Sequence, residues 1–233
     1  MITLRKAEDR GHADHGWLNT YHSFSFADYH DARHMGFRAL RVLNEDRVKP
    51  GMGFGTHGHR DMEIVSYVLE GALAHKDSMG NGSTIVPGDV QYMSAGTGVR
   101  HSEFNASETG LLHFVQIWIL PDKAGYAPRY GQIRVDKADK TGRLRLVASS
   151  DGAEGSIALR QDVRVYASVL DVGASTSLSL PKGRHLWAQA LRGTVEVNGR
   201  ALSEGDGVSA SDETPFTFKA PADETEFLVF DLA

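Results

Sequence analysis

Short apolar segments that alternate with turn residues limit the fold of this sequence more than any other feature. From residue 37 onward they recur at intervals of roughly ten residues, which is typical of a β-sandwich or barrel, whereas helical periodicity is weak. Glycine-rich turns such as KPGMG and SMGNGS separate the segments. The clearest predicted strands are FRALRVL, EIVSYVLEG, DVQYMSAG, HFVQIWIL, RVYASVLDV, HLWAQALRGTVEVNG and EFLVFDLA. The sequence therefore predicts an all-β protein.

The two halves of the chain repeat one β unit. Residues 67–97 contain YVLEGALAH followed by VPGDVQYMSAG, and residues 189–212 contain QALRGTVEVNG followed by LSEGDGVSASD. Each copy is a strand ending in Gly, an outgoing strand, a Gly-Asp turn and a returning strand. Polar, turn-rich sequence lies between the copies. We therefore expect two tandem β-barrels, at residues 1–125 and 126–233.

The N-terminal segment differs in kind, because five histidines are interleaved with aromatic residues between residues 11 and 37. Their spacings match no regular ligand face. Histidines are common at half-buried positions beside aromatic rings. We therefore interpret this segment as an aromatic arm packed over one sheet of the first barrel, in preference to a second metal cluster. The five histidines are His12, His15, His22, His30 and His34.

Composition excludes several classes of site. The chain has no cysteine, so disulfides, thiolate metal sites and cysteine nucleophiles are excluded, and any metal must be held by imidazole and carboxylate. No apolar run is long enough for a membrane span or a secretion signal, so we expect a cytoplasmic protein. The net charge is −5 and the basic residues are scattered singly, so we expect no direct binding to nucleic acid.

Two pairs of side chains are spaced for metal binding. His57 and His59 follow a glycine-rich stretch in GFGTHGHRD, and His101 and Glu103 follow another in GTGVRHSEFN. In a strand, residues i and i+2 point to the same face about 6.6 Å apart. Two such strands side by side would offer three imidazoles and one carboxylate to a single centre.

Three neutral nitrogens and one hard oxygen suit a first-row divalent ion, and six-coordinate geometry leaves two positions open for substrate or O₂. Glu63, four positions after His59, is the alternative carboxylate. We prefer Glu103 because its relation to His101 repeats the spacing of His57 and His59. Glu63 is then expected to support a ligand or to line the pocket.

Several motifs resemble known proteins. GMGFGTHGHRDME and PGDVQYMSAGTGVRHSEFN resemble the two cupin motifs. Together with SFSFADYHD, MGFRALRVLNED, HKDSMGN and QIWILP, they resemble the pirin family, especially its bacterial members described as quercetin 2,3-dioxygenases. The resemblance implies a bicupin fold of two jelly-roll barrels. It also implies one divalent ion in the first barrel, held by His57, His59, His101 and Glu103.

The resemblance further implies a metal-dependent dioxygenase that opens the heterocyclic ring of flavonols such as quercetin with O₂ and releases CO. Fe²⁺ is the expected ion, with Cu, Mn, Ni, Co or Zn as alternatives. Glu103 is the candidate base for the proton of the substrate's 3-hydroxyl. Candidate pocket-lining side chains are Phe24, Phe26, Phe54, Met93 and Phe104. We expect the second barrel to be free of metal, with His185 an ordinary half-buried histidine, and His113 and Gln116 to be satisfied polar groups of the core.

Two other functions remain open at this point. Eukaryotic pirins are described as iron-dependent transcriptional cofactors, so the chain is alternatively an iron-binding, redox-responsive regulatory protein that acts through protein partners. A cupin isomerase or sugar-binding protein would need polar and basic pocket groups that the sequence does not assign. The expected oligomeric state is a monomer.

Overall fold

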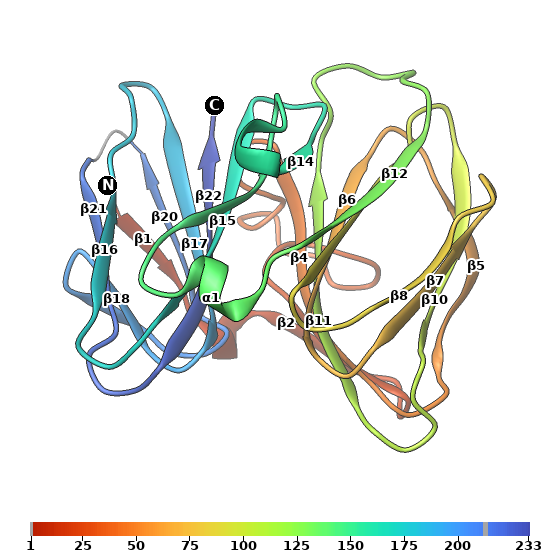
Figure 1. The fold of residues 1–233 in the computed structure, drawn as a ribbon, viewed down its shortest axis with the longest axis horizontal. Helices are drawn as coiled ribbons and strands as arrows, with labels where there is room; N and C mark the ends of the chain where they lie inside the picture. The colour runs from red at the N-terminus through yellow and green to blue at the C-terminus, as the bar shows by residue number, and fades with distance from the viewer. Residues whose placement is uncertain (1, 212–213) are drawn as a thin grey trace.

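The computed structural model describes residues 2–211 and 214–233 as two β halves that lie side by side (Figure 1). The prediction of an all-β bicupin is confirmed, since the regular helix in this part of the chain is a single short one, α1 (Lys137–Lys140). Short 3-10 segments lie at Ala7–Asp9 and Ala153–Gly155. Among the described residues, no helix is long and apolar enough to cross a membrane.

The N-terminal half pairs a seven-stranded sheet with a four-stranded one. In spatial order the large sheet contains β12 (Arg129–Arg134), β9 (Asp89–Ser94), β6 (Glu63–Glu70), β11 (Leu112–Ile119), β4 (Leu40–Val48), β3 (Leu18–His22) and β2 (Gly11–Asp14). The small sheet contains β5 (Gly53–His59), β10 (Val99–Asn105), β7 (Leu73–Asp77) and β8 (Gly82–Ile85). Each expected barrel is thus a sandwich of two sheets and not one closed ring of hydrogen-bonded strands.

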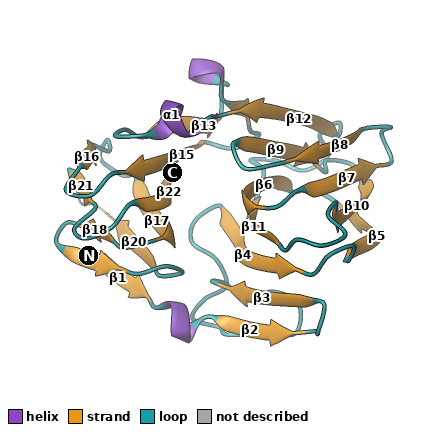
Figure 2. Cartoon of the chain, turned by 60° about the horizontal axis from the view of Figure 1, so that its bottom comes forward, coloured by secondary structure: helices purple, strands orange, loops and turns teal. Residues whose placement is uncertain are grey.

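The C-terminal half repeats this arrangement, as the internal repeat in the sequence predicts. Its large sheet contains β1 (Ile2–Arg5), β20 (Gly207–Ser211), β17 (His185–Arg192), β22 (Thr225–Leu232), β15 (Val163–Leu170), β13 (Arg145–Ser149) and β14 (Ile157–Ala158). Its small sheet contains β16 (Ser175–Leu178), β21 (Phe216–Lys219), β18 (Val195–Val197) and β19 (Arg200–Leu202). Figure 2 shows the sheets of the two halves as separate groups of strands.

Two strands tie the halves together. The first strand of the chain, β1, pairs with β20 of the C-terminal sheet, and in Figure 1 it lies, in red, among the blue strands. In the other direction, β12 pairs with β9 at the edge of the N-terminal sheet. The predicted boundary between residues 125 and 126 divides the chain by sequence order. Strands β1 and β12 lie on the other side of this boundary from the sheets that they join.

Buried apolar side chains join the two large sheets. One core cluster includes Leu43 and Val65 from the N-terminal half and Trp187 and Leu228 from the C-terminal half. Phe24 belongs to this cluster, and its ring centroid lies 4.8 Å from that of Trp187. The halves therefore share a core, and burial of this apolar surface favours their association.

The N-terminal arm differs from the expectation. It does not simply pack over a sheet, because β2 and β3 form an antiparallel hairpin that extends the large sheet beside β4. The predicted strand FRALRVL also ends too early, because β4 continues through Asn44, Glu45, Asp46 and Arg47. These four residues do not show the alternation of apolar and polar residues that is typical of a strand, because both faces of β4 carry polar side chains.

One face of β4 carries a buried ion-pair cluster centred on Glu45. Arg10 Nη1 lies 2.9 Å from Glu45 Oε2, and Arg47 Nη1 and His113 Nε2 lie 2.8 Å and 3.0 Å from Glu45 Oε1. Burial alone would raise the pKa of Glu45, but the hydrogen bond with His113 and the charges of Arg10 and Arg47 lower it to about 2. His113 is thus a satisfied core polar group, as predicted.

We expect Glu45→Gln to lower the free energy of unfolding by about 3 kcal/mol at pH 7. The folded-state pKa of Glu45 is depressed from an ordinary value of 4.5 to about 2, so its contribution is present above pH 4.5 and is lost as the pH falls toward 2. Denaturant unfolding of the wild type and the variant should therefore show a difference in the free energy of unfolding that disappears as the pH falls from 4.5 toward 2. A difference that is constant from pH 7 to pH 3 would contradict the assignment.

Candidate metal centre

The two predicted ligand pairs lie on adjacent antiparallel strands, β5 and β10. His57 faces His101 directly in the register, and Val99 faces His59. A bulge between His101 and Glu103 shifts the register after that point. Both strands are extended through these pairs, so the i, i+2 prediction holds and the imidazoles point to one side.

Three imidazole nitrogens converge at this place. His101 Nε2 lies 2.9 Å from His59 Nε2 and 3.0 Å from His57 Nε2. Metal–nitrogen bonds of about 2.0–2.1 Å at right angles place two donors about 2.9 Å apart, so these separations fit neighbouring ligands of one ion. A single neutral imidazole nitrogen cannot bond well to two others at once. The arrangement therefore fits a divalent cation better than a network of histidine hydrogen bonds.

The protonation of the histidines also fits a cation. His57 Nδ1 lies 2.8 Å from the carbonyl oxygen of Gly55, which favours the tautomer that leaves Nε2 unprotonated. Burial, followed by the charge of His57, lowers the pKa of His59 to about 4. Burial, followed by the charges of the neighbouring histidines, lowers the pKa of His101 to about 2. Both rings are therefore neutral at pH 7, as a metal ligand must be.

Glu103 is buried, as His101 is, and it is held by hydrogen bonds. Gln116 Nε2 donates to Glu103 Oε2 at 2.8 Å, and Ser66 Oγ lies 3.3 Å from Glu103 Oε1. Burial raises the pKa of Glu103 to about 7; the bond from Ser66 opposes the rise, whereas the charge of Asp46 adds to it. A divalent cation nearby would favour the charged carboxylate.

The structure divides the four predicted ligands between two overlapping groups. His57, His59 and His101 form one group in which all ligand atoms lie within 4.8 Å of one another. His101 and Glu103 form a second group with His75, within the same distance. His101 belongs to both groups and links them. None of the five histidines of the N-terminal arm belongs to a group of this kind in residues 2–211 and 214–233.

His75 is a residue of this site that the sequence reasoning missed. It faces Glu103 across the pairing of β7 with β10, and Asp77 faces His101. The His75 ring is buried, its Nε2 lies 3.4 Å from Asp77 Oδ2, and its centroid lies 5.3 Å from that of His101. The signal was present in HKDSMGN, where two ionisable residues share one strand face, but only the register shows what they face.

Glu63 lies elsewhere and neither supports a ligand nor lines the pocket. Its carboxylate accepts hydrogen bonds from Tyr92 Oη at 2.7 Å and from the backbone N–H of Arg160 at 3.0 Å, and Ser94 also donates to it. Arg160 comes from the C-terminal half, so Glu63 fastens the two halves together. The expectation for this residue was wrong because β6 turns its side chain toward β9 and the second half.

A cavity of about 310 Å³ opens onto His57, His59 and Glu103. Its walls include the aromatic rings of Trp17, Phe26, Phe54 and Trp118. The ring centroids of Trp118 and His59 lie 4.9 Å apart at 81°, and those of Trp17 and Phe54 lie 5.3 Å apart at 74°. Aromatic rings therefore form much of the wall of this cavity, and His57 and His59 of the candidate metal centre are part of the same wall.

The predicted pocket lining was partly wrong. Phe26 and Phe54 line the cavity, but Phe24, Met93 and Phe104 do not. Phe24 and Met93 are buried in core clusters, and Phe104 is exposed because strand alternation turns it away from its neighbour Glu103. Gln116 both lines the cavity and is a satisfied polar group, so its two possible roles coincide.

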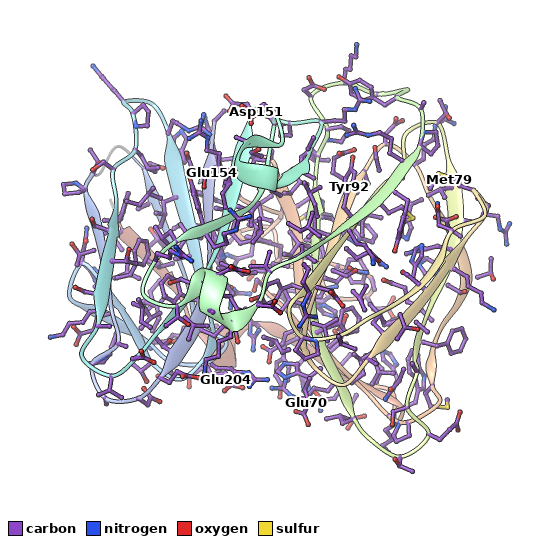
Figure 3. The ribbon with its side chains drawn as sticks, in the orientation of Figure 1. Glu70, Met79, Tyr92, Asp151, Glu154 and Glu204 are labelled. Carbon is purple, nitrogen blue, oxygen red and sulfur yellow. The ribbon has the colours of Figure 1, made fainter. Side chains whose placement is uncertain are left out.

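A larger crevice of about 680 Å³ lies between the halves on the other face of β3 and β4. Its charged groups are largely paired with each other, as in the Arg10–Glu45 and Arg47–Glu204 ion pairs. Glu204, labelled in Figure 3, lies at the same end of the molecule as Glu70 of the other half. The smaller cavity, and not this crevice, is the one that His57, His59 and Glu103 line.

We expect His101→Ala to abolish binding of a divalent ion, because this residue belongs to both ligand groups. Isothermal titration with Ni²⁺ should give one equivalent for the wild-type protein and none for the variant. His12→Ala, in the N-terminal arm, is the control and should bind one equivalent. Retention of a full equivalent by His101→Ala would place the ion elsewhere.

Comparison with known proteins agrees with this geometry. The family model described as Pirin matches residues 3–119, and the one described as Quercetinase C-terminal cupin domain matches residues 146–232. A quercetin 2,3-dioxygenase of Escherichia coli (strain K12) is 48% identical over 232 residues, which cover 100% of this chain and 99% of that protein.

Solved structures agree as well. The crystal structure of YhhW from Escherichia coli is 47% identical and has a TM-score of 0.96, with 100% of this chain and 98% of that chain covered. A structure of the bacterial pirin YhhW in complex with nickel(II) has a TM-score of 0.94 at 47% identity, with 100% of this chain and 99% of that chain covered. On these matches, the chain belongs to the pirin family.

Proposed function

We propose that this protein is a quercetin 2,3-dioxygenase that holds one Fe²⁺ through His57, His59, His101 and Glu103. The observation that carries the proposal is the convergence of three imidazole nitrogens beside a cavity lined by aromatic rings, with a buried carboxyl in the same cavity. The name of the Escherichia coli relative supports the reaction, and the nickel(II) complex of YhhW supports a divalent ion.

The donor set suits this chemistry. Three imidazoles and one carboxylate leave two positions open on a six-coordinate ion, whereas a structural site is usually closed. When bound, the ion supplies a Lewis acid that polarises a phenolic oxygen of the substrate.

The side chains that line the cavity position and desolvate the substrate. A flavonol is flat, and the rings of Trp17, Phe26, Phe54 and Trp118 offer apolar faces and edges to it. Exclusion of water from such a cavity when the substrate is bound strengthens every electrostatic interaction inside it.

We infer that Glu103 takes the proton of the 3-hydroxyl. It lines the same cavity as His57 and His59, and a hydrogen bond from Gln116 Nε2 holds its Oε2 in place. Proton removal gives a more electron-rich ring, which reacts with O₂ so that CO and a ring-opened ester are released. The atoms of O₂ enter the products, so no further reductant is required.

The overall reaction is tested by incubating the Fe²⁺-loaded protein with quercetin. We expect one O₂ consumed and one CO released for each quercetin lost, measured with an oxygen electrode and by trapping CO on haemoglobin. The His101→Ala protein treated in the same way is the control for free iron. A fully metal-loaded protein that gives neither signal would favour the regulatory alternative.

Glu103→Gln should show which of the two candidate carboxylates, Glu103 or Glu63, binds the metal. It keeps the shape of the side chain but loses its charge and basicity, so metal affinity should fall by about 10–100-fold or more and turnover by about 10²–10⁴-fold. Glu63→Gln should retain its metal and its turnover, and instead lose stability, because its carboxylate bonds to Tyr92 and Arg160. Metal content and turnover rate are measured in parallel for both variants. Loss of the ion from Glu63→Gln, with retention of the ion by Glu103→Gln, would contradict the assignment of Glu103 as the ligand.

A further inference from the structure

A second buried carboxyl, Asp46, lines the same cavity as Glu103. It lies on β4 directly opposite Thr20 of β3, and both side chains point into the cavity. Asp46 is only 4% exposed. Strand alternation places Glu45 on the other face of β4, in the ion-pair cluster between the halves. Asp46 is therefore separated from the basic groups that satisfy its neighbour.

Two other polar side chains of the cavity, Asn44 and Gln116, already have hydrogen-bond partners. Asn44 Oδ1 lies 2.9 Å from His22 Nδ1, and Gln116 Nε2 donates to Glu103. The Thr20 hydroxyl lies beside the Asp46 carboxyl and opposes the rise in its pKa. A carboxyl group has two oxygens and about four acceptor positions. One hydroxyl therefore leaves most of the acceptor capacity of Asp46 open to the cavity.

A carboxyl in such a place is costly to the fold. Burial is the main reason that the pKa of Asp46 is raised to about 7, so the free protein gains little from this group. A buried acid that is perturbed by desolvation and that faces a cavity is typical of a group that serves a ligand.

We propose that Asp46 accepts a hydrogen bond from a second hydroxyl of the substrate, in addition to the 3-hydroxyl that the metal centre takes. It is thus a specificity-determining residue that selects polyhydroxylated flavonols over flavonols with the 3-hydroxyl alone. The inference rests on the proposed function and extends it from the reaction to the choice of substrate. A site that must pair a buried polar group rejects an analogue without the matching hydroxyl, since its acceptor is then left unpaired.

Binding can be measured without turnover, because Trp17 and Trp118 line the cavity and a flavonol bound there should quench their fluorescence. The Ni²⁺-loaded protein is titrated without oxygen with quercetin, which has five hydroxyls, and with 3-hydroxyflavone, which has one. The variants are Asp46→Asn and Asp46→Ala. The control is Glu45→Gln, which removes a carboxylate one residue away on the opposite face of the same strand. Metal content is measured for every sample.

We expect wild-type protein to bind quercetin more tightly than 3-hydroxyflavone. Asp46→Ala removes the acceptor and should lose about 10–100-fold in affinity for quercetin. Asp46→Asn keeps an acceptor oxygen and should lose less, and both variants should lose less than about threefold for 3-hydroxyflavone. Glu45→Gln should bind both compounds as the wild type does. Full metal content in the Asp46 variants would show that the centre itself is intact.

Three results would overturn the inference. Equal losses for the two compounds would show that Asp46 acts through the fold or the metal, and no loss for either would show that it makes no contact. In both cases the wild type still binds quercetin, so the proposed function stands. If metal-loaded wild-type protein binds neither compound and releases no CO from quercetin, the proposed function fails and the inference fails with it.

Discussion

The antiparallel pairing of β5 with β10 is the constraint on which the metal centre depends. Each strand by itself places two donors on one face, but the register that sets His57 opposite His101 brings three nitrogens to one point. Hydrogen bonds between the strand backbones fix this register. A slip by one residue would turn every donor on one strand to the opposite face. The positions of the donor atoms are therefore fixed by the strand pairing of the sheet that contains them.

Desolvation then decides the chemistry of the centre. Burial keeps His59 and His101 neutral by lowering their pKa values, and it raises the pKa values of Glu103 and Asp46. Neutral imidazoles and basic carboxyls are the forms that bind a cation and accept a proton. The aromatic walls that exclude water, Trp118 among them, thus also set the protonation of the ligands.

Strand β4 serves two parts of the molecule at once. Asn44 and Asp46 face the cavity, whereas Glu45 and Arg47 face the crevice between the halves. One face therefore helps to define the ligand site and the other helps to hold the halves together through buried ion pairs. This double duty explains why β4 is polar for four consecutive positions although it lies inside a large sheet.

The sequence by itself determined the all-β architecture, the internal repeat and the spacing of the four candidate ligands, because strand alternation is a local property of the chain. Only the tertiary structure decided which distant residues meet. His75 reaches Glu103 through strand pairing, Glu63 turns toward Arg160, and Asp46 faces the cavity. The sequence also did not predict that β1 joins a sheet of the C-terminal half and β12 a sheet of the N-terminal half. Packing in the folded protein determines which strands far apart in the chain pair with each other.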